Sequence, residues 1–133
     1  MPILYEWLVE DEVLYNRVWG EFTEDEVEES ASLVVQHFNS ATHQVYFLID
    51  TLDIRTFPKN MLRVLPMTKD FVTHQNMRQL IVVSNNTAVK FVTSIAANLQ
   101  KNKLVLFTNL DDALDYLRKQ LPEFAADIKM PVS

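Results

Sequence analysis

The chain has 133 residues, 48% hydrophobic and 23% charged, with a net charge of −6 at pH 7, which fits one globular domain and argues against disorder. It has no cysteine, which excludes disulfides and thiolate chemistry, and its single glycine, Gly20, cannot build a phosphate-binding loop or dinucleotide fingerprint. No apolar run approaches the roughly 18 residues of a membrane span, and the negative charge disfavours nucleic-acid binding. We expect a cytoplasmic protein that uses no cofactor, binds no nucleic acid and inserts into no membrane.

Charge is separated along the chain. Residues 1–53 hold 12 acids and one base, whereas residues 54–103 hold eight bases and one acid. Such asymmetry can mark a partner-binding face. It is also typical of a solvated surface whose halves neutralise each other in the fold.

The N-terminal half predicts a hairpin, a helix and a buried strand. Residues 3–10 and 12–19 are rich in β-branched and aromatic residues and predict a β-hairpin. Thr23 and Glu26 form a capping box ahead of an amphipathic helix. The nearly all-apolar run 44–50 predicts a strand covered on both faces.

The second half alternates helices and strands. Pro58 suits the start of a helix and Pro66 should break or kink it, so two short helical pieces are expected before Arg78. Strands at residues 80–85 and 103–108 each precede a helix. The order β-β-α-β-α-β-α-β-α predicts an α/β fold with a mixed, mostly parallel five-stranded sheet, an N-terminal hairpin and about four helices. The domain is expected to span residues 1–121, followed by an irregular tail over 122–133.

Four segments resemble a known family: VWGEFTEDEVEE, FLIDTLDIRTFP, LIVVSNN and VLFTNLDDALDYL. They resemble the STAS domain, which occurs in anti-sigma-factor antagonists and sulfate-transporter tails, and more closely small bacterial STAS-like proteins of unassigned function. The resemblance covers about residues 3–120. In regulatory members of the family, a phosphorylatable serine begins the helix after the third strand. In this sequence Lys59, Asn60 and Met61 stand at the positions of the family's serine–serine–glycine. The resemblance therefore implies a scaffold used for binding, without that phosphorylation switch.

Asp50 and Asp53 form an acidic pair at the expected end of the third strand. Open α/β sheets place their ligands at the carboxyl ends of parallel strands, and two acids there could hold a hard cation. The alternative interpretation is that Asp50 bonds loop amides and Asp53 caps a turn.

Arg55, Lys59 and Arg63 are candidate anion-binding residues. Lys59 and Arg63 are four residues apart, so a helix beginning at Pro58 would place them on one face near its free amide groups. Ordinary solvated side chains explain the same residues.

The aromatic residues of the hairpin predict a patch. If Leu4, Leu8, Leu14 and Val18 face the helices, then Tyr5, Trp7, Tyr15 and Trp19 share the far face. An exposed aromatic patch is typical of an interface or ligand groove, and a self-complementary one would favour a homodimer. The alternative is that a helix or the tail covers this face.

These features favour a non-enzymatic regulatory or scaffolding domain. It would act by protein–protein interaction, with another protein or with itself, or by binding a small, partly apolar anionic ligand. One alternative is a lipid or metabolite carrier or sensor. Another is a metal-assisted hydrolase or phosphotransfer protein that uses Asp50 and Asp53.

Overall fold

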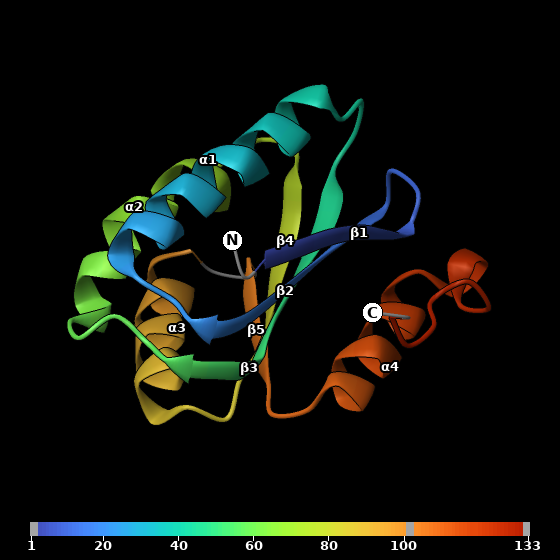
Figure 1. Cartoon of the computed structure of the whole chain (residues 1–133). Coiled ribbons are helices and arrows are strands. Elements are labelled where there is room, and N and C mark those ends of the chain that lie inside the picture. The colour runs from blue at the N-terminus through green and yellow to red at the C-terminus, as the bar shows by residue number, and fades with distance from the viewer. Residues whose placement is uncertain (1–2, 101–102, 132–133) are drawn as a thin grey trace.

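A five-stranded sheet carries helices on both of its faces (Figure 1). The computed structural model describes residues 3–100 and 103–131. In chain order its elements are β1 (Ile3–Val9), β2 (Val13–Glu21), α1 (Glu24–Ser40), β3 (Val45–Thr56), the 3₁₀ turn η1 (Met61–Arg63), α2 (Val64–Val72), β4 (Met77–Val83), α3 (Thr87–Leu99), β5 (Leu104–Phe107), α4 (Leu110–Gln120) and the 3₁₀ turn η2 (Pro122–Phe124). None of the helices in these ranges is long and apolar enough to cross a membrane.

The strands lie in the order β1-β2-β3-β4-β5. β1 pairs with β2 antiparallel, and every other neighbouring pair is parallel. The predicted mixed sheet with an N-terminal hairpin is confirmed. The crossover connections between the parallel strands all have the same handedness, so α1, α2 and α3 lie on the same face of the sheet. Helix α4 lies on the other face (Figure 1).

Each face of the sheet has its own hydrophobic core. On the α1 side, Phe47 of β3 is fully buried among residues of α1 and α2, such as Phe38 and Phe71. On the α4 side, Tyr15 and Leu48 pack against that helix. The segment after α4 joins the second core: Ile128 is buried, and its carbonyl accepts a hydrogen bond from Arg118 Nε at 2.9 Å.

Side-chain caps fix where three helices begin. Thr23 Oγ1 accepts from the Glu26 amide at 3.3 Å, as the capping box predicts. Asn86 caps α3 by accepting from the Val89 amide at 3.0 Å. α4 is capped by Asn109, whose Oδ1 accepts from the Asp112 amide at 2.8 Å.

β3 is longer than predicted, and its extra length alters the start of the next helical segment. It continues through Thr56 beside β2, whereas β4 stops opposite Asp50. Two register shifts in the β2–β3 pairing take up the extra residues of β3, and Gly20 beside the second one has φ of 76°, which favours glycine. The expected pair of short helices is present as η1 and α2, but Pro66 lies in the first turn of α2 rather than at a break.

Candidate functional site

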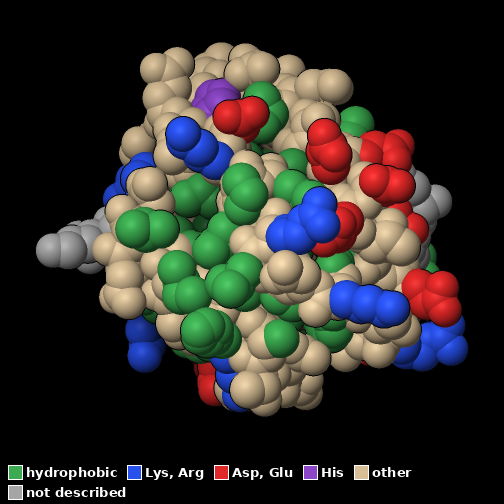
Figure 2. Space-filling model, turned by 90° about the vertical axis from the view of Figure 1, so that its left-hand side faces the viewer, with side chains coloured by type: hydrophobic (Ala, Val, Ile, Leu, Met, Phe, Trp, Pro, Cys, Tyr) green, Lys and Arg blue, Asp and Glu red, His purple; other side chains and the backbone are tan. Residues whose placement is uncertain are grey.

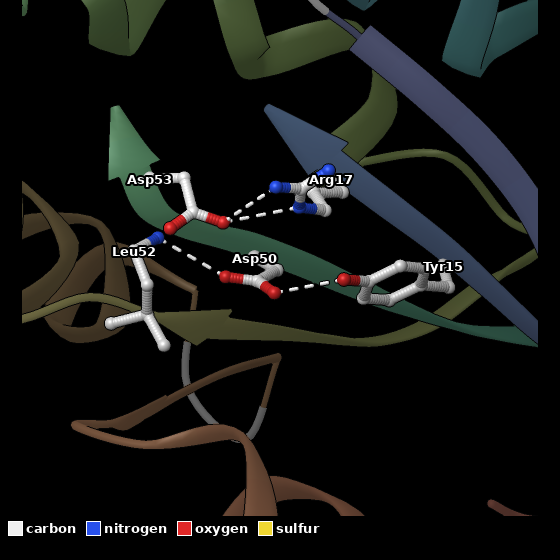
Figure 3. A network of polar contacts seen from close by, with 5 residues as sticks. All are labelled: Tyr15, Arg17, Asp50, Leu52 and Asp53. Carbon is white, nitrogen blue, oxygen red and sulfur yellow. Dashed lines mark hydrogen bonds and ion pairs between the residues drawn. The ribbon is translucent and has the colours of Figure 1, made fainter. Parts of the chain in front are cut away.

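Asp50 lies inside β3, not at a strand end, and is 5% exposed. Its Oδ2 accepts a hydrogen bond from the Tyr15 hydroxyl at 2.8 Å, and its Oδ1 accepts one from the Leu52 amide at 3.1 Å (Figure 3). Burial, and then the bond to this carboxylate, raise the pKa of Tyr15 well above its ordinary value. The two side chains therefore form one buried polar pair that links β2 to β3.

Asp53 has a different partner. Its Oδ2 accepts two hydrogen bonds from Arg17, from Nε at 3.1 Å and from Nη2 at 2.8 Å. The bond to Asp53 raises the pKa of the guanidinium, which also lies 5.0 Å from the ring centre of Trp19. The pair is largely solvated, so its contribution to stability is at most about 1 kcal/mol.

The two aspartates do not converge on a common point; Figure 3 shows each carboxylate bound to a different partner. Among residues 3–100 and 103–131, no group of three or more His, Cys, Asp or Glu side chains could hold a metal ion. The expectation of an acidic pair at a strand end is therefore wrong, because β3 continues for six residues past Asp50. The arrangement gives the metal-assisted enzyme no support.

The basic residues do not share a helix face. Arg55 is an exposed residue of β3, Lys59 precedes η1, and Arg63 ends that turn. Arg63 Nε lies 3.6 Å from Glu24 Oε1 at the start of α1. The predicted helical pair of Lys59 and Arg63 is wrong because helical structure begins only at Met61. Arg55 and Lys59 make no ion pair within the ranges that the structure covers.

The hairpin aromatics are divided between the two faces of the sheet. The register pairs Trp7 with Leu14 and Glu6 with Tyr15, and residues opposite each other in an antiparallel pair lie on one face. Tyr5 and Trp7 therefore pack toward α1, while Tyr15, 1% exposed, packs in the core beneath α4.

The predicted aromatic patch is thus wrong, and a homodimer through it loses its basis. Trp19, the fourth member of that patch, is half-buried beside Arg17. The expectation placed odd-numbered residues of both strands on one face, but the observed register pairs odd residues with even ones. A one-residue change in hairpin register moves every side chain to the other face.

A cavity of about 150 Å³ lies between the sheet and helices α1, α2 and α3. Its wall is overwhelmingly apolar and includes Phe47 and Ile49 of β3, Leu65 of α2 and Val92 of α3. The inner face of α3 carries small or branched side chains, Val89, Val92, Thr93 and Ala96, which leave space above the sheet. Figure 2 shows hydrophobic side chains gathered around a hollow on this side of the molecule, with Lys and Arg side chains around it.

The rim of the cavity adjoins two exposed cations in the sequence. Ile54, Phe57, Pro58 and Met61 line it, and Arg55 and Lys59 are their neighbours in sequence. Cations beside an apolar hollow suit a ligand that has an apolar part and a negative charge.

The outer face of α3 carries a second apolar stripe. Phe91 is 54% exposed and Leu99 is 72% exposed, and the half-buried Ile95 lies between them at helical spacing. Ala88, on the same side of the helix, is exposed as well. The apolar side of this helix is wider than the part that the sheet covers, so the spacing alone did not show which of its apolar residues are buried.

Comparisons with known proteins agree on the fold. No protein-family profile and no curated protein matches the sequence. An uncharacterised DUF3478-family protein with a SpoIIAA-like fold, from Shewanella loihica PV-4, aligns with a TM-score of 0.60 at 17% identity, covering 86% of this chain and 91% of that one. This chain has the SpoIIAA-like fold.

Two structures of SpoIIAA itself give the same result. The Bacillus cell fate determinant SpoIIAA in its phosphorylated form aligns with a TM-score of 0.58 at 13% identity, over 87% of this chain and 99% of that one. The anti-sigma factor antagonist SpoIIAA in its unphosphorylated form aligns with a TM-score of 0.57 at 16% identity, covering 88% of this chain and 96% of that one. The resemblance to STAS-like proteins is confirmed at the level of the fold.

Sequence reasoning missed the cavity and its polar residues Asn16 and Ser30, both of which are buried. One signal was available: Asn16 interrupts the apolar pattern of a strand whose neighbours are covered by helices. The space itself has no sequence signature, because it depends on how far α2 and α3 stand apart.

Proposed function

We propose that this protein is a non-enzymatic regulatory binding domain whose cavity holds the apolar part of a small anionic ligand. The observation that carries the proposal is the apolar cavity of about 150 Å³ between the sheet and α1, α2 and α3. Another protein is known to bind benzene in an apolar cavity of similar volume, about 150 Å³. Arg55 and Lys59 would attract the acidic group at the rim.

The resemblance in fold supports a regulatory role. The solved relatives include a cell fate determinant and anti-sigma factor antagonist. Lys59, Asn60 and Met61 stand where the resemblance would place a switch serine. A bound ligand would therefore replace phosphorylation as the signal.

Hexanoate is a suitable probe because it joins a short apolar chain to one negative charge. By isothermal titration calorimetry, we expect hexanoate to bind more tightly than 1-hexanol, which lacks the charge. In the double variant Arg55→Gln/Lys59→Gln, the preference for hexanoate over 1-hexanol should fall about threefold to tenfold, because each cation is solvated and contributes modestly.

The matched control is Lys119→Gln/Lys129→Gln, which removes two exposed cations outside the cavity lining. It should leave the preference unchanged. Failure of both hexanoate and 1-hexanol to bind the wild type would contradict the proposed function.

The exposed stripe on α3 favours a second function, contact with a protein partner or with a second copy of the chain. Phe91 and Leu99 are two of the four large hydrophobic residues exposed among those that the structure describes. Exposed apolar residues in a contiguous stripe are typical of interaction surfaces. Since the segment from 54 to 103 carries eight bases and one acid, an acidic partner surface would complement it.

Self-association is the version of this second function that can be tested without knowing a partner. We expect any dimer seen by sedimentation equilibrium to weaken at least tenfold in Phe91→Ser/Leu99→Ser, because the stripe would lie at the contact. The exposed pair Thr87→Ser/Asn98→Ser on the same helix serves as control. A dimer that the stripe variant leaves intact would rule out this surface as the contact between copies.

A further inference from the structure

One corner of the cavity is polar. Asn16 of β2 lines it and is only 2% exposed, yet its Oδ1 accepts no hydrogen bond from any residue that the structure describes. Buried side-chain oxygens nearly always have a hydrogen-bond partner, so an unpaired one within a binding cavity needs an explanation. A second cavity residue, Ser30 of α1, lies close by.

The neighbouring contacts show why Oδ1 is the atom left over. Tyr5 is opposite Asn16 in the hairpin register, and its hydroxyl lies 3.0 Å from Ser30 Oγ. Burial raises the pKa of Tyr5, while hydrogen bonds to its hydroxyl from the side chains of Ser30 and Asn16 act in the opposite direction. The Tyr5 hydroxyl donates to the Ser30 carbonyl at 3.3 Å, so its proton is not directed at Asn16 Oδ1.

Asn16 Oδ1 is thus a buried acceptor that Tyr5 does not satisfy, on a residue that lines the cavity. Among the other cavity-lining hydroxyls, Thr51 already donates to the Val83 carbonyl at 2.7 Å and Thr68 donates to the Leu65 carbonyl at 2.8 Å. A buried acceptor that has no partner among apolar groups selects for a ligand that brings the donor.

We propose that the ligand carries an O–H or N–H donor on its apolar part and that this group bonds to Asn16 Oδ1. The inference rests on the proposed function and narrows the ligand class. Alcohols, phenols and N–H heterocycles satisfy the asparagine, whereas a plain hydrocarbon chain leaves it unpaired. Sites built to hydrogen-bond a ligand discriminate strongly against analogues that lack the group.

Phenol and toluene test the donor directly, because they differ by a hydroxyl in place of a methyl group and both suit a cavity of this volume. We compare the ratio of their dissociation constants, Kd(toluene)/Kd(phenol), in the wild type and in Asn16→Leu. The ratio should be at least about fivefold higher in the wild type, the difference expected for one hydrogen bond. If the leucine variant does not fold, Asn16→Ala gives the same comparison.

Thr68→Val is the control, because it removes a lining hydroxyl that is already bonded to a carbonyl, and it should leave the ratio unchanged. An equal ratio in the wild type and Asn16→Leu, with both probes bound, overturns the donor requirement and leaves the proposed function standing. If neither probe nor hexanoate binds the wild type, the proposed function itself fails, and the inference fails with it.

Discussion

Replacing Phe47 by alanine is expected to lower the free energy of unfolding by about 3–5 kcal/mol, a large share of the roughly 5–15 kcal/mol available to a domain. Phe47 is fully buried at the centre of the core on the α1 side. Its ring makes edge-on contacts with Phe38 of α1 and Phe71 of α2, each at 5.7 Å between ring centres. The substitution removes both contacts and enlarges the cavity that the ring lines.

Urea denaturation followed by circular dichroism measures this loss. The matched control is Phe91→Ala, the same substitution at a position that is 54% exposed on α3, and it should change the free energy of unfolding by less than about 1 kcal/mol. Equal losses at the two positions would contradict the packing described for this face of the sheet.

Filling the cavity should abolish most ligand binding. Ala96 lies on the inner face of α3 and lines the cavity, so Ala96→Leu places three additional carbon atoms where the ligand would lie. We expect the affinity for hexanoate to fall at least tenfold. The free energy of unfolding should stay within about 1 kcal/mol of wild type, because the larger side chain occupies existing space instead of overpacking the core.

Ala88→Leu on the exposed side of the same helix is the control, and hexanoate affinity should be unchanged in it. A loss of about 1–3 kcal/mol in Ala96→Leu would be the signature of overpacking. That outcome would mean that the space beneath α3 is too small for a ligand.

The fold was predictable because its signals are local and agree with one another. The hairpin, the cap at Thr23 and the alternation of buried strands with amphipathic helices all predicted the same mixed sheet. The errors arose at features that depend on how separate elements pack against each other. The alternation of side chains along β1 and β2 fixed which residues share a face within each strand, but their relative register, set by the turn near Asp11, was not visible.

The candidate site was less predictable than the fold. Asp50 was recognised as unusual, but its role as the acceptor for Tyr15 depends on the register of β2 against β3, which places Tyr15 opposite Leu48, two residues before Asp50. Arg55 and Lys59 were recognised by charge alone, and they are next in sequence to the cavity-lining residues Ile54 and Pro58 without lining the cavity themselves. Asn16 has meaning only once the cavity is known, because an asparagine in a strand is otherwise an ordinary polar residue.

The most direct test of ligand binding in the cavity is to locate hexanoate on the protein by titrating it into ¹⁵N-labelled wild-type chain and recording amide chemical shifts. We predict that the largest shifts occur at residues around the cavity, such as Val34, Ile49 and Val92, while α4 on the opposite face is unchanged. Shifts centred on α4, or no saturable shifts at all, would contradict the claim that the space between the sheet and α1, α2 and α3 is a ligand-binding cavity.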